Sequence, residues 1–283
     1  MNILVIAHPH DPLAYFVATA FHQSFLSLGY TSSILPQYEA GFDVCLVMYA
    51  HVQYNFPKDS TYKIAYNWEC LPHPRWRKNV RRMAHQFNCI WECSQENLKV
   101  SLPIRHVYCP IGYHRSFEMP ATVGDVRNIS FLGYLPPKNP YRKRIVDSIE
   151  KELGLQIWYA KTQSEYIHHF SDSRIPIADI IHNTQIHLNI HQNSAYPMFE
   201  SIRVLSFLLS NKKFIISENS CDSPLINKVH YVETDRFPDT IKYYLAQPEE
   251  REQIAQQGYS FISKHYRMEE HIAKALHETD CKG

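Results

Sequence analysis

The stretch IHLNIHQNSAYPMFESIRVLSFLLSNKKFIISE, residues 186–218, holds a complete strand, loop, helix and strand. Its first part, Ile186–His191, alternates apolar and polar residues, which is typical of a strand. A polar segment then leads into an apolar pattern with helical spacing at Phe199–Leu209 and into a second strand at Lys213–Ser217. Strands that alternate with helices predict a parallel sheet covered by helices.

The same alternation runs through the rest of the chain and forms two successive sets. The first set has a buried strand at 2–7, a helix at 13–28, and short strands at 33–35, 44–49, 64–67, 89–93 and 106–109. The second set has strands at 129–132 and 156–159 and helices at 141–153, 238–247 and 249–264, besides the unit at 186–218. Between them, HRSFEMPATVGDVRN (114–128) is polar and aperiodic, as a linker is.

The expected fold class is therefore α/β, with two Rossmann-like domains whose parallel sheets face a cleft. The chain of 283 residues is long enough for two such domains, at 1–122 and 123–265. In open α/β sheets, ligands bind outside the carboxyl ends of the strands. The loops that follow the strands are thus the places to look for a site.

Composition narrows the class of protein. The formal net charge of +1 gives no reason to expect a nucleic acid as the main partner. No apolar run approaches the roughly 18 residues of a membrane span, and the opening strand lacks the flanks of a signal peptide. The seven cysteines are scattered without a C-x-x-C pair, which indicates reduced thiols. We expect a cytoplasmic protein.

An anion site is predicted where the second set begins. The sequence FLGYLPPKNPYRKR (131–144) is a strand, a turn at Gly133 and a helix start that carries four cations, Lys138, Arg142, Lys143 and Arg144. Free amides at a helix start together with cations suit a diphosphate. The alternative is a solvated basic helix face.

Glu200 is the candidate ribose ligand. We expect Pro197 at the first position of its helix, with Glu200 and Arg203 one turn apart beneath the preceding loop. A carboxylate beside such a loop accepts both hydroxyls of a ribose in other nucleotide folds. The alternative is that Glu200 only stabilises the helix dipole and pairs with Arg203, worth about 0.2–0.5 kcal/mol.

Residues 188–218, the terminal helix pattern at 244–276 and the basic helix start at 131–144 resemble the carboxy-terminal domain of GT-B glycosyltransferases of the bacterial family-1 type. The resemblance covers roughly residues 125–280 and touches 87–114. It implies that Glu200 holds the donor ribose, that Lys138 or Arg142 meets the diphosphate, and that the last helix, at 266–283, packs back on the first domain. The donor-binding residues that we expect are Gly133, Tyr134, Lys138, Arg142, His191, Ser194, Tyr196, Met198, Phe199, Glu200 and Arg203.

Two features bear on the chemistry that this resemblance implies. Retaining members of the family carry two glutamates eight residues apart, whereas Gln192 stands eight residues before Glu200, so the stereochemical outcome stays open. The chain has no D-x-D triad, which fits GT-B enzymes that stabilise the leaving diphosphate with cations and amides. We therefore expect neither a metal nor a cofactor, only a nucleotide-diphosphate sugar as donor substrate.

The catalytic base is expected in the first domain. The resemblance places AHPHDP (7–12) at the exit loop of the first strand, where His10 and Asp11 are candidates to deprotonate an acceptor hydroxyl. His8 lies closer to the strand and has a packed, hydrogen-bonded histidine as its alternative reading. Glu69 follows another strand and is a third candidate base, or else it pairs with a nearby arginine.

A rival interpretation rests on the same loop. VIAHPHDP also resembles the AHPDDE strand exit of zinc-dependent sugar de-N-acetylases, with His8, His10 and Asp11 as metal ligands. Pro12 stands where that motif has its glutamate, and the second domain is left unexplained.

A basic cluster lies within RWRKNVRRMAHQF, where Trp76, Val80, Met83 and Phe87 are expected to form an apolar helical stripe flanked by the cations of Arg75–Arg82. The cations are either a solvated face or a contact with an anionic membrane or a lipid-linked acceptor. We expect a metal-independent glycosyltransferase that acts on a glycan, a lipid-linked acceptor or a small molecule, in the cytoplasm or at the inner membrane face. The alternative is a sugar-nucleotide-binding scaffold without turnover.

Overall fold

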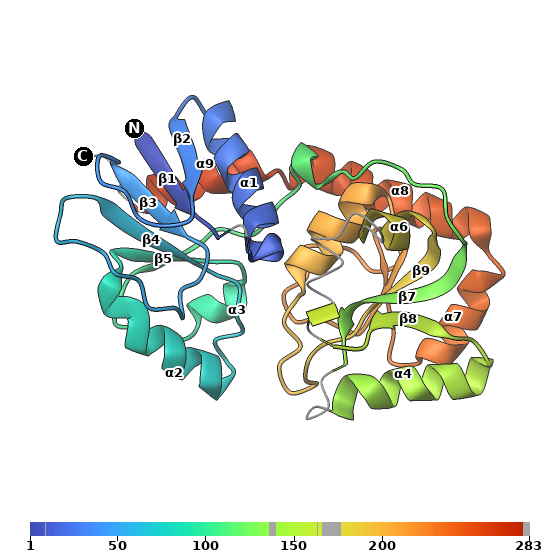
Figure 1. Cartoon of the computed structure of the whole chain (residues 1–283). Coiled ribbons are helices and arrows are strands. Elements are labelled where there is room, and N and C mark those ends of the chain that lie inside the picture. Colours follow the sequence, from blue (N-terminus) through green and yellow to red (C-terminus); the bar gives the residue numbers. More distant parts are fainter. Residues whose placement is uncertain (9, 136–139, 163, 166–176, 280–283) are drawn as a thin grey trace. The chain divides into compact units, whose positions relative to one another are not determined.

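The computed structural model describes residues 1–8, 10–135, 140–162, 164–165 and 177–279. The chain forms two compact units. Unit 1 comprises Met1–Ser116 together with Tyr266–Gly283, and unit 2 comprises Phe117–His265 (Figure 1).

In the described residues, unit 1 is built on a six-stranded sheet with the order β2-β1-β3-β4-β5-β6. Every neighbouring pair is parallel, as expected, so that Ile3 of β1 pairs with Ser32 on one side and with Val44 on the other. The strands are β1 (Asn2–Ile6), β2 (Thr31–Leu35), β3 (Val44–Val47), β4 (Tyr62–Asn67), β5 (Cys89–Glu92) and β6 (His106–Tyr108). The helices are α1 (Pro12–Ser27), α2 (Pro74–Met83), η1 (Ala84–Gln86), α3 (Gln95–Leu98), η2 (Arg115–Phe117, which reaches into unit 2) and α9 (Met268–Thr279).

The two faces of this sheet have separate cores. On one face, Phe21 and Phe25 of α1 pack against Trp91, and Phe21 also meets Tyr66 edge to face. The other face buries a second apolar cluster: Leu4, Ile6, Cys45, Val47, Ala65, Val80, Met83, Phe87 and Ile90. The alternation of side chains along each strand supplies both cores at once.

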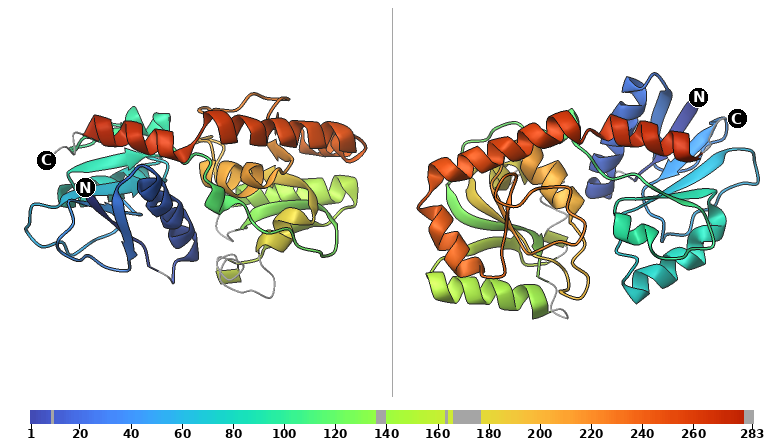
Figure 2. Two further views of the ribbon diagram at one scale, coloured as in Figure 1. Left: turned by 90° about the horizontal axis from the view of Figure 1, so that it is seen from above. Right: turned by 180° about the vertical axis from the view of Figure 1, so that it is seen from behind.

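The last helix, α9, is part of unit 1 and lies against α1 (Figure 2). Thr279 accepts a hydrogen bond from Trp91 Nε1 at 2.9 Å, and its carbonyl accepts one from the Tyr62 hydroxyl at 3.2 Å. At the start of α9, Tyr113 exchanges backbone bonds with Tyr266 and Met268. A Cβ on Gly112 would lie 2.5 Å from the Tyr266 carbonyl oxygen, so only glycine fits there.

In the described residues, unit 2 is built on a five-stranded parallel sheet with the order β11-β10-β9-β7-β8. Its strands are β7 (Arg127–Tyr134), β8 (Ile157–Ala160), β9 (Thr184–Asn189), β10 (Ile215–Ser217) and β11 (Val232–Glu233). Its helices are α4 (Pro140–Leu153), α6 (Ile177–His182), a π-helix η3 (Ile202–Leu208), η4 (Leu209–Asn211), α7 (Phe237–Leu245) and α8 (Pro248–His265). The chain runs outward from β7 to β8 and then returns to β9 on the other side, so the strand order reverses between β7 and β9.

Unit 2 begins six residues before the boundary that the sequence suggested. The side chain of Asn211 donates to the Phe117 carbonyl at 2.9 Å and accepts from the Met119 amide at 2.7 Å. Thr122 accepts a further bond from Asn183. These bonds tie residues 117–122 to unit 2, because polar side chains there satisfy their backbone groups.

The helix expected at Phe199–Leu209 also differs from the structure. Pro197 is not its first residue, because the Cys221 amide donates to the Pro197 carbonyl and the Phe199 amide donates to Asp222. The helical turns begin only at Ser201 and widen into the π-helix at Ile202–Leu208. π-Turns of this kind often occur at functional sites.

Candidate functional site

The strongest polar cluster of unit 2 lies where its strand order reverses. Arg142 comes from the first turn of α4, which follows β7, and Arg203 comes from the π-helix, which follows β9. Both guanidinium groups lie over the ring of Phe131, with their central carbons 5.2 and 4.9 Å from its centroid. Such a reversal is where α/β sheets bind ligands.

The two arginines tie the neighbouring loops together. Arg142 Nε donates to the carbonyls of Ile190 and His191 at 3.1 and 3.2 Å. Arg203 donates from Nε to the Leu132 carbonyl and from Nη1 to Asn189 Oδ1, both at 2.7 Å. Both side chains are buried, so most of their hydrogen-bonding capacity is used inside the unit.

Glu200 lies between these two cations. Its Oε1 accepts from Arg142 at 3.2 Å, and its Oε2 is 3.7 Å from Arg203 Nη1. Burial raises the pKa of the Glu200 carboxyl, but Arg203 and Arg142 outweigh it and hold this pKa below its ordinary value. The side chain is 31% exposed, so an ionised, oriented carboxylate remains open to a ligand.

Gly133 belongs to the same cluster for a steric reason. A Cβ at this position would lie 2.7 and 2.8 Å from two ring atoms of Phe131 and 3.5 Å from Arg203 Nη2. Any side chain here would push against the ring on which both arginines rest.

A pocket of about 370 Å³ lies beside this cluster, at the carboxyl ends of β9, β10 and β11. It is lined by Tyr141, Ile145, His191, Ser194, Pro197, Glu218, Asn219, Thr234, Asp235 and Phe237. Glu218 links two other lining residues, since it accepts hydrogen bonds from the His191 amide at 2.6 Å and from the Tyr141 hydroxyl. Its volume is in the range of small-molecule sites.

One ring nitrogen of His191 lacks a hydrogen-bond partner. Its Nε2 lies 3.1 Å from the Asn219 carbonyl, which only a protonated nitrogen can satisfy. Nδ1 is buried and has no hydrogen-bond partner in the described residues. Buried polar atoms are nearly always paired, so this nitrogen is an exception.

In unit 1, Asp11 has a structural role. It is the N-cap of α1, with Oδ1 accepting from the Ala14 amide at 3.1 Å, and its Oδ2 accepts from the Tyr49 hydroxyl. His8 Nδ1 accepts from the His10 amide at 3.2 Å, and the two imidazole rings are 4.9 Å apart. His10 is exposed at the carboxyl end of β1.

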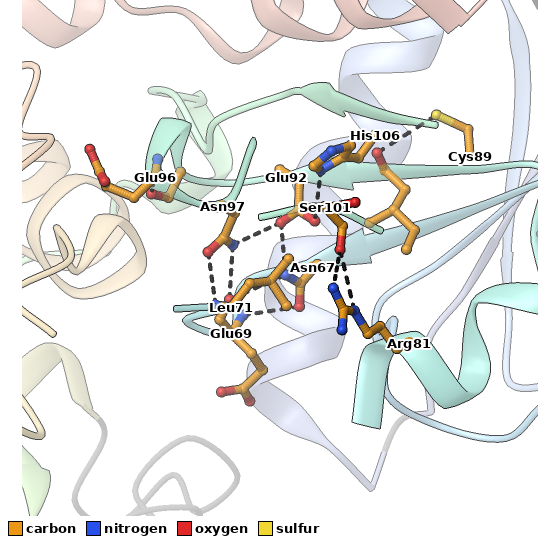
Figure 3. A network of polar contacts seen from close by, with 12 residues as sticks. Asn67, Glu69, Leu71, Arg81, Cys89, Glu92, Glu96, Asn97, Ser101 and His106 are labelled. Carbon is orange, nitrogen blue, oxygen red and sulfur yellow. Dashed lines mark hydrogen bonds and ion pairs between the residues drawn. The ribbon is translucent and has the colours of Figure 1, made fainter. Parts of the chain in front are cut away.

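Glu69 follows β4 and is held through its backbone. Its amide donates to Asn67 Oδ1 at 3.2 Å, and its carbonyl accepts from Asn97 Nδ2 at 2.9 Å. Figure 3 shows its carboxylate directed away from these contacts. The loop of Glu69 is thus held by these backbone bonds, and the carboxylate points away from Asn67 and Asn97.

The basic cluster lies on α2, whose first turn carries no acidic residue. Arg75, Lys78, Arg81 and Arg82 are exposed, and in the described residues no cation from Arg75 to Arg82 forms an ion pair. Arg81 donates to the Ser101 carbonyl at 2.7 Å, and Arg75 lies over the Trp76 ring. The helix therefore presents unneutralised positive charge.

The described residues contain no group of three or more His, Cys, Asp or Glu side chains placed to hold a metal ion, and His8, His10 and Asp11 do not form one. The described part of the chain also contains no helix with the length and apolar character needed to cross a bilayer.

Residues 142–277 match the family model described as "Glycosyl transferase-like". Over its length the chain is similar to solved glycosyltransferases. AviGT4, which is involved in avilamycin A biosynthesis, is 12% identical, with a TM-score of 0.60 over 99% of this chain and 98% of that one. The likeness to such structures shows that the chain has the GT-B fold.

Two further structures have the same fold. HepE from Anabaena, solved with UDP-glucose, gives a TM-score of 0.64 at 10% identity, over 98% of this chain and 100% of that one. An α-glucosyltransferase solved with UDP and DNA gives 0.59 at 10% identity, over 99% of both chains. No curated protein sequence matches this chain.

The family match contains most of the residues expected at the donor site. The structure brings Arg142, Glu200 and Arg203 together with Gly133, and it places His191 and Ser194 on the adjoining pocket. Tyr134 is half-buried at the end of β7, Tyr196 and Met198 are half-buried on the loop after β9, and Phe199 is buried. Lys138 lies outside the described residues.

The sequence analysis missed five residues of the pocket and included one cation that lies away from it. Tyr141, Glu218, Asn219, Thr234 and Asp235 were missed, although all but Tyr141 follow β10 or β11 directly, which is the signal that identifies such residues. Lys143 is turned to solvent, where its ammonium pairs with Asp147 at 2.5 Å.

Proposed function

We propose that this protein is a glycosyltransferase that moves a sugar from a nucleoside diphosphate sugar to a hydroxyl acceptor, and that unit 2 binds the donor. The observation that carries the proposal is the ionised, part-exposed Glu200 carboxylate, held by Arg142 and Arg203 at the reversal of strand order. A fixed carboxylate accepts both hydroxyls of a ribose. HepE, which has the same fold, was solved with UDP-glucose.

The pocket beside Glu200 suits the rest of a nucleotide. Its wall of Ile145, Pro197 and Phe237 offers apolar contact to a base. The leaving diphosphate would sit near the start of α4 and the loop after β9. There, backbone amides and the field of two buried arginines favour negative charge.

We propose that transfer needs no metal ion. Arg142 and Arg203 supply positive charge that is already oriented by bonds to Ile190, His191 and Leu132. Such charge stabilises a departing diphosphate without reorganising during the reaction. The arginines would act mainly through Glu200 and through their field, since they are largely buried.

For the acceptor side we propose Glu69 as the general base. Asp11 already accepts two hydrogen bonds, as the cap of α1 and from Tyr49, so its carboxylate is committed to structure. Glu69 combines a backbone fixed by Asn67 and Asn97 with a carboxylate directed away from them (Figure 3). His10, exposed at the carboxyl end of β1, is the alternative base.

Two further proposals concern where the protein is located in the cell. We propose that the unpaired cations of α2 rest on an anionic membrane surface, since each such cation adds about 1 kcal/mol there. We also propose a cytoplasmic location, supported by the thiols of Cys45, Cys89 and Cys109, which are buried and free.

The test is a thermal-shift and turnover comparison of parent, Glu200→Ala and Asp147→Ala proteins with UDP, other nucleoside diphosphates and their sugars. Asp147 is the control because it lies half-exposed on α4 and pairs only with Lys143 there. A ligand at 100 times its Kd adds about 2.7 kcal/mol to stability, so binding is readily seen. We expect stabilisation and release of nucleoside diphosphate in the parent and the Asp147 variant, and the loss of both with Glu200→Ala.

Failure to bind any nucleoside diphosphate refutes the donor site. Binding without release of diphosphate in the presence of hydroxyl acceptors would leave a sugar-nucleotide-binding protein and refute the transfer reaction.

A further inference from the structure

A fully buried carboxyl group lies at the end of β5. Glu92 has no exposed surface, and its Oε2 accepts hydrogen bonds from Asn67 Nδ2 at 2.7 Å and from Asn97 Nδ2 at 2.8 Å. The group on its other side is His106 of β6, whose Nδ1 lies 3.9 Å from Oε1, too far for a hydrogen bond. Neither His106 Nδ1 nor Glu92 Oε1 has a hydrogen-bond partner in the described residues.

Such a carboxyl group is costly for the fold. Burial raises the pKa of Glu92 to about 8, although the bonds from Asn67 and Asn97 oppose that rise. An apolar residue of similar size would avoid this cost, as replacements of buried charged groups show. The group therefore needs a reason other than packing.

The two asparagines that Glu92 binds converge on the loop of Glu69 (Figure 3). Both Nδ2 atoms also donate to the Glu69 carbonyl, at 3.2 Å from Asn67 and 2.9 Å from Asn97. Their Oδ1 atoms accept from the amides of Glu69 and Leu71, at 3.2 and 2.9 Å. Each asparagine thus clamps the loop with both ends of its amide.

The direction of these amides depends on Glu92. An asparagine side chain can turn over and exchange its oxygen for its nitrogen. The buried Oε2 atom accepts from both Nδ2 groups, so it favours the orientation in which each Oδ1 faces a loop amide. Without that acceptor, a turned amide would point its NH₂ group at the amides of Glu69 and Leu71.

We propose that Glu92 is a positioning residue, which acts through Asn67 and Asn97 to hold the loop 68–71 so that the Glu69 carboxylate meets the acceptor in one geometry. The inference rests on the proposed transfer function and names the device that makes Glu69 an effective base. Misplacing a reacting group by about 1 Å costs on the order of 100-fold in rate.

The test compares Glu92→Leu, Glu92→Gln and Ile90→Ala with the parent protein. Gln keeps an oxygen that accepts from both asparagines, whereas Leu removes it. Ile90, on the same strand and also buried, is the control for a loss of stability that does not touch the clamp. The readouts are amide hydrogen exchange by NMR, kcat, and KM for the donor sugar nucleotide.

With Glu92→Leu we expect faster exchange at the amides of Glu69 and Leu71 and a fall in kcat of about 100-fold. Donor KM stays unchanged, because the donor binds unit 2. Glu92→Gln should restore slow exchange and most of kcat, and Ile90→Ala should leave both near the parent values.

Unchanged exchange at Glu69 and Leu71 in Glu92→Leu overturns the clamp. Faster exchange with unchanged kcat overturns its role in catalysis, and equal losses in Ile90→Ala reduce it to general stability. If the parent performs no transfer while Glu92→Leu still speeds exchange at these amides, the proposed function has failed and the clamp has not.

Discussion

Replacing Gly133 by alanine should disturb the donor site without touching a polar atom. The new Cβ would lie 2.7 Å from the nearest Phe131 ring atom, whereas ordinary contacts begin at 3.4 Å, so the ring must retreat by 0.7 Å, which is 3.4 minus 2.7. Phe131 has no exposed surface and belongs to the core of unit 2. Overpacking of this kind costs about 1–3 kcal/mol, or about 3–9 °C in Tm for a unit of this size.

The same displacement should weaken donor binding. Arg142 and Arg203 both lie on the Phe131 ring and hold Glu200, so moving the ring shifts the carboxylate. Loss of a hydrogen bond to a charged group costs about 1.5–3 kcal/mol, which raises Kd about 10- to 100-fold. Scanning calorimetry measures the first effect, and titration calorimetry with the diphosphate that stabilises the parent measures the second.

Ile254→Ala is the matched control. Ile254 packs in the same core from α8, and its truncation costs about 2–5 kcal/mol without a change at the arginines. It should lower Tm at least as much as Gly133→Ala and leave Kd unchanged. An unaltered Kd in Gly133→Ala, or an equal rise in Ile254→Ala, would refute the link between the ring and the carboxylate.

Two further predictions concern pH and membranes. Burial lowers the pKa of His187 to about 3. Its contribution to stability is complete above about pH 6.5, the pKa of histidine in the unfolded chain, and is lost as the pH falls toward 3. The loss amounts to about 3 kcal/mol at pH 4.5. Denaturant unfolding at pH 7.5 and 4.5 should show a smaller loss in His187→Gln, whose amide can still donate to the Ile181 carbonyl and accept from Ser130; an equal loss contradicts the assignment. The triple change Arg75→Gln, Lys78→Gln and Arg82→Gln should weaken the binding free energy to phosphatidylglycerol vesicles by about 3 kcal/mol, as measured by sedimentation. Lys274→Gln on α9 should not, and retention of the triple variant would rule out α2 as the contact.

Periodicity predicted the strands β1 to β10 and the long helices α1, α4, α7 and α8, because helices cover each sheet and the apolar pattern of these strands is uninterrupted. It failed at Pro197 and at the unit boundary, since both depend on bonds from Cys221 or Asn211, which are distant in sequence. Glu200 could be anticipated because its loop follows a predicted strand. Glu218 carries the same signal, since it follows the predicted strand Lys213–Ser217, whereas Asp235 could not be anticipated, because β11 is only two residues long.

His187 and Asp11 show why a residue type does not settle a role. His187 shares a strand face with His191, yet it is sealed between Ser130 and the Ile181 carbonyl. Asp11 stands beside two histidines but caps α1. Whether a polar side chain meets a ligand or its own backbone depends on tertiary contacts that no local pattern contains.

The inclusion of α9 in unit 1 has a consequence for biosynthesis. Thr279 supplies a partner to Trp91 and to Tyr62, so the first unit lacks part of its core until residue 279 has been translated. Unit 2 is one continuous segment and can fold as soon as His265 has left the ribosome. Residues 117–265 can thus complete unit 2 while residues 1–116 still lack the contacts that α9 supplies.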